Sequence, residues 1–204
     1  MIQRFQRKNR GTIPPKKVIY IFSEGKVTEP KYFEAIRKEL KLPTIHIKPL
    51  GTGYHTVSLV EYVIKAMYTE DEPETEWWVV FDKDSWKDFD KAIALAKKNN
   101  ISVAYSNECF ELWFILHYDF LDSDIGRKGY NEILSKKFGY NYEHHSKESE
   151  NSAQIYNLIK DKEVTACKYA EKLLKAQQER KDSKIMAPAT TVHLLVKSLR
   201  ALKL

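Results

Sequence analysis

Short apolar segments that alternate with amphipathic segments of helical periodicity constrain the fold of this chain more than any other feature. Val18–Phe22 and Trp77–Phe81 are apolar almost throughout, which is typical of strands buried on both faces of a parallel sheet. Two further strands are expected at Thr44–Leu50 and Ile101–Tyr105. Amphipathic helices are predicted between the strands, over 28–40, 56–68 and 86–99. This order predicts an α/β fold with an open, mainly parallel sheet and right-handed crossovers that place helices on both faces.

The rest of the chain departs from this alternation. The segment CFELWFILHY, residues 109–118, is dense in aromatic side chains and is predicted to form a buried helix. Residues 119–152 are polar and contain three glycines, so an irregular segment is expected, followed by helices over 153–179 and 189–202. The sequence therefore divides into a basic flexible arm at 1–15, an α/β core at 16–118, and at 119–204 an irregular segment with C-terminal helices packed on that core.

Composition excludes several classes of protein. The chain of 204 residues has 43% hydrophobic and 30% charged residues, which is ordinary for a globular protein. Its apolar segments are too short to cross a bilayer and its first residues include no apolar signal segment, so neither membrane insertion nor secretion is expected. Its two cysteines cannot form a disulfide framework or a four-thiolate zinc site, and we therefore expect a cytoplasmic protein.

The net charge of +6 is concentrated near the N-terminus. Among the first 17 residues six are basic and none is acidic, whereas the remaining 187 residues hold 28 basic and 28 acidic ones. The six basic residues are Arg4, Arg7, Lys8, Arg10, Lys16 and Lys17. A basic arm on a neutral body could bind the phosphates of a nucleic acid. The same composition suits a solubilising tail, and the sequence leaves both interpretations open.

Acidic residues follow two of the predicted strands at the point where each strand ends. Glu24 follows the first strand, and Asp82 and Asp84 follow the third. Because the carboxyl ends of parallel strands meet at one edge of a sheet, these side chains are expected to lie close together. Asp82 and Asp84 share a face of an extended segment, and two close carboxylates repel each other unless a cation lies between them. A glutamate in a turn, or an aspartate pair at the start of a helix, is common on its own. The two together, at the ends of two parallel strands, predict a site for Mg²⁺ or Mn²⁺.

Further residues are candidates for contacts with metal or substrate. Glu111 lies in the aromatic helix just beyond the fourth strand, and a buried acid needs a partner such as a metal, a lysine or backbone amides. Lys26 and Lys83 stand beside the acids and could bind substrate phosphates or neutralise the carboxylates. Thr190 and Thr191, at the start of the last predicted helix, could bind an anion or simply cap that helix.

Longer motifs carry a resemblance to a known family. The segments SEGKVTEPKYFEAI, SNECFELWFILHY and APATTVHLLVKSL, with the DKD of residues 82–84, resemble the RloB family of prokaryotic proteins. Glu-Gly after one strand and Asp-x-Asp after another resembles the Toprim fold of topoisomerases, bacterial primases and certain nucleases. The chain departs from the family pattern at Glu108, where proline is usual, and at Ala187 and Ala189, in a stretch that usually reads Asn-Pro-Ser-Thr.

This resemblance implies a Toprim-like domain with divalent-metal chemistry, in restriction or anti-phage defence loci and often beside an ATPase partner. In such nucleases the glutamate acts with the metal and the aspartates bind it, which corresponds here to Glu24, Asp82 and Asp84. The CFELW segment would place Glu111 near the same site.

Three functions are consistent with these patterns. The first is a Mg²⁺-dependent nuclease that cleaves DNA or RNA, in which Glu24, Asp82 and Asp84 hold the metal with support from Glu111. The second is a non-catalytic module that binds nucleic acid, an ATPase or a second copy of the chain through its C-terminal helices. The third is nucleotidyl transfer, for which the chain has little room for a template-handling apparatus.

Overall fold

A computed structural model describes residues 17–51, 53–70, 74–145, 149–180 and 185–203. The arm residues expected to contact nucleic acid, Arg4, Arg7, Lys8 and Arg10, lie outside the described residues. Within the described part, no helix combines the length and the apolar character needed to cross a membrane.

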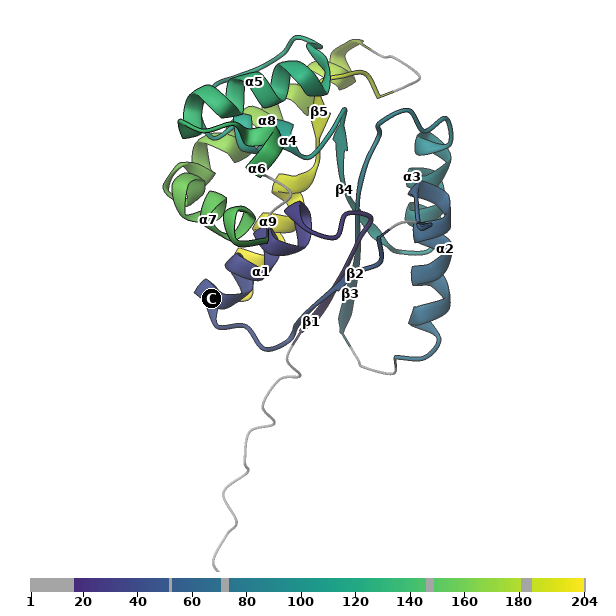
Figure 1. Ribbon diagram of the computed structural model, residues 1–204. Coiled ribbons are helices and arrows are strands. Elements are labelled where there is room, and N and C mark those ends of the chain that lie inside the picture. Colours follow the sequence, from purple (N-terminus) through teal and green to yellow (C-terminus); the bar gives the residue numbers. More distant parts are fainter. Residues whose placement is uncertain (1–16, 52, 71–73, 146–148, 181–184, 204) are drawn as a thin grey trace, which may run out of the picture.

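The described residues contain a five-stranded sheet in the order β2-β1-β3-β4-β5 (Figure 1). Its strands are β1 (Val18–Ser23), β2 (Ile45–Pro49), β3 (Thr75–Asp82), β4 (Ser102–Asn107) and β5 (Ala189–Thr190). The first four strands are parallel, and β5 runs antiparallel to β4. The prediction of an α/β fold with a mainly parallel sheet is therefore confirmed.

Helices cover both faces of the sheet, as predicted. On one face α2 (Thr56–Met67) and α3 (Phe89–Lys98) pack against alternate strand residues such as Tyr20 and Phe22. On the other face α1 (Thr28–Leu40) packs against Ile19 and Ile21. Figure 1 shows these two layers on either side of the strands, with the C-terminal helices on the side of α1. Burial of both strand faces explains why the strands are almost continuously apolar.

The expectation of an irregular segment over 119–152 is wrong. This region contains α5 (Gly126–Phe138), α6 (Tyr142–His145) and the beginning of α7 (Ser149–Ile159). Tyr130 and Leu134, one helical turn apart, are fully buried in the core, and this burial stabilises α5 despite its polar sequence. Glycines stand at the boundaries of α5: Gly126 begins the helix, and Gly139 ends it in the left-handed conformation that lacks a steric penalty for glycine.

The two late helices also differ from the prediction. The expected helix over 153–179 is divided by the short 3-10 helix η1 (Lys160–Lys162) into α7 and α8 (Glu163–Arg180). The segment expected to begin the last helix forms β5 first, and α9 (Val192–Ala201) follows. The hydroxyl of Thr190 donates to the carbonyl of Tyr105 at 3.0 Å, and that of Thr191 donates to the carbonyl of Val103 at 2.8 Å. These two hydrogen bonds attach β5 and the start of α9 to β4.

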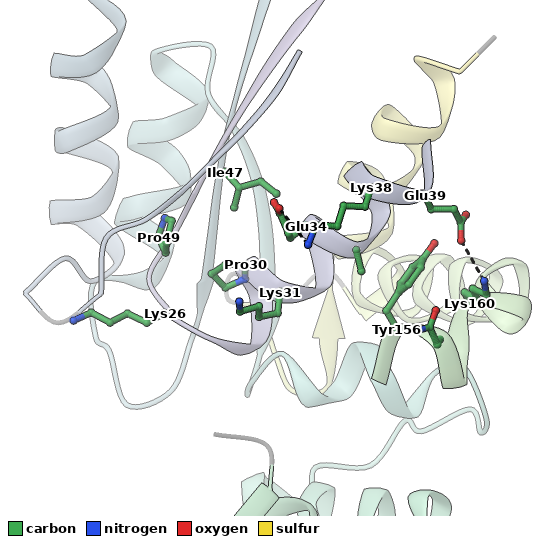
Figure 2. Close-up of a pocket in the computed structure, with 12 residues that line it drawn as sticks. Lys26, Pro30, Lys31, Glu34, Lys38, Glu39, Ile47, Pro49, Tyr156 and Lys160 are labelled. Atoms are coloured by element: carbon green, nitrogen blue, oxygen red, sulfur yellow. Dashed lines mark ion pairs between the residues drawn. The ribbon is translucent and has the colours of Figure 1, made fainter. Parts of the chain in front are cut away.

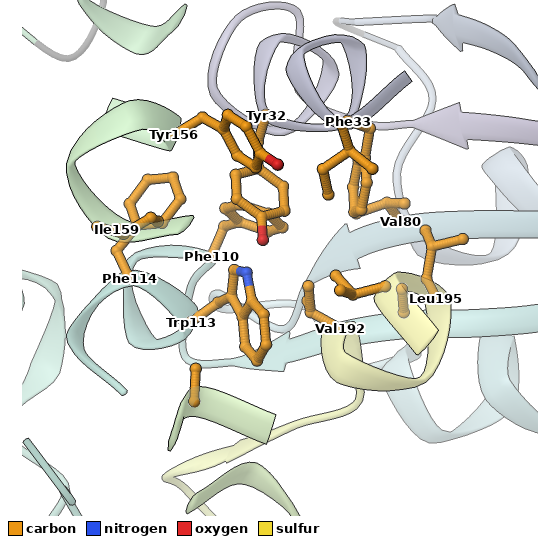
Figure 3. Close-up of a cluster of buried hydrophobic side chains, with 14 of the residues drawn as sticks. Tyr32, Phe33, Val80, Phe110, Trp113, Phe114, Tyr156, Ile159, Val192 and Leu195 are labelled. Carbon is orange, nitrogen blue, oxygen red and sulfur yellow. The ribbon is translucent and has the colours of Figure 1, made fainter. Parts of the chain in front are cut away.

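The aromatic segment after β4 forms the centre of the core on the α1 side. It contains the short helix α4 (Glu111–Ile115), and Phe110 and Trp113 pack against Tyr32 of α1 with ring centroids 5.8 and 6.4 Å apart (Figure 3). Tyr156 of α7 contacts the same Tyr32 ring. The sheet, α1 and the C-terminal helices thus share one hydrophobic cluster, which fixes where α4 begins.

Candidate functional site

The four acids predicted to form a site lie in one pocket of about 210 Å³, at the carboxyl ends of β1 and β3. Backbone pairing holds this edge together, because the amide of Glu24 donates to the carbonyl of Val80 in β3 at 3.0 Å. The residues that line the pocket are Glu24, Gly25, Thr28, Glu29, Asp82, Asp84, Phe110, Glu111 and Arg127. The pocket therefore has five carboxylates and one guanidinium in its wall.

One carboxylate oxygen of Glu24 forms a hydrogen bond, and the other forms none with the described residues. The Nδ1–H of His55 donates to Oε1 of Glu24 at 2.6 Å, while Oε2 is buried and accepts no hydrogen bond from the described residues. Burial raises the pKa of Glu24, and the hydrogen bond and charge of His55 oppose that rise. A buried carboxylate oxygen without a donor is costly, so this atom is suited to accept a ligand or an ion.

The backbone and a neighbouring ring fix the position of His55. It precedes the first residue of α2, and its amide donates to the Ser58 hydroxyl at 2.9 Å. Its imidazole stacks on Trp86 with ring centroids 4.2 Å apart and planes 24° apart. His55, Trp86 and Glu24 also line an open hollow of about 420 Å³ that adjoins the acidic pocket through Glu24 and Asp84. The acidic pocket and this hollow therefore share part of their wall.

Arg127 of α5 pairs with both aspartates. Its guanidinium bonds Oδ1 of Asp84 and lies 3.7 Å from Oδ2 of Asp82. The Asp82 side chain is only 15% exposed. Its burial, and then the charges of Glu29, Glu111 and Asp84, raise the pKa of Asp82 well above its usual range, and Arg127 opposes this rise. One guanidinium thus balances only part of the negative charge in the pocket.

Glu29 and Glu111 complete the acidic wall. Glu29, in the first turn of α1, packs against Gly25, where an added Cβ would lie 2.1 Å from its Oε2. Burial raises the pKa of Glu29 to about 7, and the charges of Glu111 and Glu24 add to the rise. Glu111, 8% exposed at the start of α4, accepts a hydrogen bond from the Tyr142 hydroxyl at 3.1 Å. Gly25 is therefore required by the close approach of the Glu29 carboxylate.

The donor set fits a hard divalent cation in its chemistry. Carboxylate oxygens are the ligands that Mg²⁺ prefers, and an ion would neutralise charge that Arg127 leaves uncompensated. Across residues 17–203, apart from the undescribed gaps, no three His, Cys, Asp or Glu side chains are grouped closely enough to hold an ion as they stand. Ligation by three of these acids therefore requires side-chain rotation.

The two lysines expected beside the acids do not line the acidic pocket. Lys83 lines an adjoining hollow with Asn107 and Met186, and this hollow shares Asp84 with the acidic pocket. The expectation that Asp82 and Asp84 share a face of an extended segment is wrong, because β3 ends at Asp82 and Asp84 lies in a turn with a φ of 41°. Lys26 lines a groove on the other side of the loop between β1 and α1.

Three residues of the site were not predicted from the sequence: His55, Glu29 and Arg127. His55 lies in the connection between β2 and α2, directly before the helix, so only its general position at the carboxyl edge of the sheet could have suggested it. Glu29 reads as an ordinary acid in the first turn of a helix. Arg127 lies on α5, in the region expected to be irregular, and no local signal connects it to the aspartates.

Comparison with known protein families identifies a relationship. A family model described as RloB-like protein matches residues 19–199. Neither the curated proteins nor the solved structures include a match to the chain. The matched range covers the acidic pocket and most of the chain, and it confirms the resemblance of the sequence motifs to the RloB family. The chain belongs to the RloB-like protein family.

Proposed function

We propose that this protein is a divalent-metal-dependent nuclease of the Toprim type, which cleaves phosphodiester bonds of DNA or RNA in prokaryotic anti-phage defence. One observation carries the proposal. Glu24, Asp82 and Asp84, from the ends of two neighbouring parallel strands, line one pocket with Glu111, and Oε2 of Glu24 is buried without a hydrogen-bond partner among the described residues.

Each acid has a distinct part in this proposal. Asp82, Asp84 and the free oxygen of Glu24 are the metal ligands, and Glu111 supports them from the start of α4. When bound, Mg²⁺ or Mn²⁺ supplies positive charge for the scissile phosphate and lowers the pKa of a water molecule. His55 orients Glu24 by donating to Oε1, which leaves Oε2 without a hydrogen bond from the described residues.

The guanidinium of Arg127 can pair with a carboxylate or with a phosphate. A guanidinium binds either anion through paired N–H groups. In the protein described here Arg127 bonds Asp84 and lies beside Asp82. In the proposed complex it contacts a phosphate oxygen of the substrate, because metal binding removes its role as the counter-ion of the aspartates.

A non-catalytic module that works with an ATPase remains the second candidate. The observation that favours it is the pairing of Arg127 with the aspartates, which balances part of their negative charge without a metal ion. Its expected docking surface, the helices at 155–174 and 192–202, has much of its apolar surface buried in the core, including Ile159, Ala170 and Leu195. Some apolar side chains on these helices, such as Val164, are exposed.

A cleavage assay separates the two functions. Labelled plasmid, single-stranded DNA and tRNA are incubated with the native chain, in EDTA and with Mg²⁺ or Mn²⁺. We expect metal-dependent cutting, and a loss of at least about 100-fold in Glu24→Gln and Asp82→Asn. Glu61→Gln, which neutralises an exposed acid on α2, is the matched control and is expected to cut like the native chain.

Two results would contradict the nuclease. Cutting that persists in both site variants would come from another site or a contaminant. No cutting by the native chain, alone or with a candidate ATPase partner, would favour the binding module.

A further inference from the structure

A groove of about 720 Å³ lies between the edge strand β2, helix α1 and helix α7 (Figure 2). It is larger than the acidic pocket and shares no lining residue with it. Its wall consists of Lys26, Pro30, Lys31, Glu34, Ala35, Lys38, Glu39, Ile47, Pro49, Tyr156, Asn157 and Lys160. Nothing in the proposed chemistry of the acids uses this groove.

The groove and the acidic pocket lie on either side of a single segment, Glu24–Lys31. Gly25 and Thr28 of this segment line the acidic pocket. Lys26 and Lys31 line the groove. A chain molecule that crosses the segment would therefore meet the acids and the lysines in succession.

The acids of the groove are already paired with cations. Glu34 bonds Arg37 at 2.6 Å and lies 3.8 Å from Lys38. Glu39 is paired with Arg200 at 2.8 Å and with Lys160 at 3.5 Å. These contacts cancel the negative charge that the groove wall would otherwise carry.

Two lysines of the groove are left with uncompensated charge. Lys26 and Lys31 form no ion pair with any described residue, so the groove has a net positive charge at the end nearer the acids. The stem of Lys26 lies across Gly51, where an added Cβ would be 1.8 Å from Cε of the lysine. Figure 2 shows Lys26 at this end, beside Pro49, and Lys160 at the other.

We propose that this groove binds the sugar–phosphate backbone of a single polynucleotide strand, on one side of the bond that reaches the acidic pocket. The ammonium groups of Lys26 and Lys31 contact successive phosphates, and the apolar side chains of Ile47 and Pro49 face the sugars and bases. Charge complementarity and the shared segment with the acidic pocket favour a polynucleotide over an acidic peptide. This proposal rests on the nuclease function only in the step that follows binding, which is cleavage of the strand where it reaches the acidic pocket.

Binding is measured separately from cleavage. Fluorescein-labelled single strands of RNA and of DNA, each about 16 nucleotides long, are titrated with the full chain in EDTA, and anisotropy is recorded over a range of salt concentrations. The double variant Lys26→Ala/Lys31→Ala is compared with Lys91→Ala/Lys98→Ala. The control pair removes the same charge from α3, on the opposite face of the sheet.

We expect the groove variant to bind about tenfold more weakly at low salt, with the slope of log K against log salt reduced by about 1.4, as for two lost phosphate contacts on a single strand. The control pair is expected to retain the native slope. The RNA and DNA arms identify which strand the groove accepts.

Equal binding by the groove variant and the control pair would overturn the proposal and leave the groove as a surface for a protein. Absence of strand binding by the native chain would overturn it as well. Neither result bears on the acids, which the metal-dependent cleavage of plasmid and tRNA tests independently.

Discussion

Glu24 and His55, 31 residues apart in the chain, are joined by a hydrogen bond of 2.6 Å between Oε1 and Nδ1. The other oxygen of Glu24 is buried and receives no hydrogen bond within the part of the chain that the structure describes. His55 is therefore a positioning residue for Glu24, and its removal should act on metal binding before it acts on folding.

Replacement of His55 by alanine is expected to raise the Mg²⁺ concentration needed for half-maximal cleavage by about 10–100-fold, because Glu24 loses the group that orients it. His55→Asn, whose side-chain amide can donate to the same oxygen, should recover part of the native value. The measurement is a Mg²⁺ titration of the cleavage rate. An unchanged metal requirement in His55→Ala would show that this hydrogen bond does not orient a ligand.

Arg127→Ala should lower the melting temperature in EDTA, because Asp82 and Asp84 lose their shared counter-ion. Added Mg²⁺ should then raise the melting temperature of this variant more than that of the native chain, since the ion takes over the same charge. Thermal unfolding with and without Mg²⁺ measures both effects. Lys128→Ala, at the neighbouring exposed position, is the control. Equal Mg²⁺ responses in all three proteins would argue against an ion at the aspartates.

The stability of the metal-free protein should depend on pH through Glu29. Its pKa is raised from 4.5 to about 7 in the folded state, chiefly by burial. A carboxyl group that holds its proton more tightly when folded stabilises the fold fully below pH 4.5, and this contribution is lost as the pH rises through 7. The loss is on the order of 3 kcal/mol in the free energy of unfolding.

Urea denaturation in EDTA across this pH range tests the expectation. Glu29→Gln, which cannot ionise, should show a flatter profile than the native chain, and Glu61→Gln should show the native profile. Identical slopes in Glu29→Gln and the native chain would mean that Glu29 titrates at its ordinary value.

Gly25→Ala should distort the acidic pocket by pushing the Glu29 carboxylate out of contact, since the new Cβ would overlap it. A cost of about 1–3 kcal/mol in the free energy of unfolding is typical of such overpacking. In a Glu29→Ala background the same substitution should cost less, because the overlapping atoms are gone. A double-mutant cycle by urea denaturation measures the difference. Equal costs in both backgrounds would mean that the strain of Gly25→Ala does not arise from overlap with the Glu29 carboxylate.

The first half of the chain was predictable because its signals are local. Continuous apolar strands such as Trp77–Phe81 reflect burial on both faces, and the end of each parallel strand locates an edge residue such as Glu24 or Asp82. His55 was not located in this way, because it lies beyond a loop after β2 and directly before α2.

The second half was less predictable because its structure depends on contacts between distant segments. Helix α5 is polar in sequence and is stabilised by the burial of Tyr130 and Leu134 in a core built by other elements. Strand β5 has two residues and owes its position to the hydroxyl contacts of Thr190 and Thr191 with β4. Neither leaves a periodic pattern that a single sequence reveals.

The pairing between β1 and β3 has a mechanical consequence for the pocket. The amide of Glu24 is bonded to the carbonyl of Val80, so the backbones that carry Glu24 and Asp82 belong to one ladder and can separate only if the sheet opens. Arg127, by contrast, is carried by α5, which lies outside that ladder. Glu24 and Asp82 are therefore fixed relative to each other by the sheet, whereas the position of Arg127 depends on the packing of α5. A displacement of α5 would remove Arg127 from the aspartates without altering the spacing of the Glu24 and Asp82 backbones.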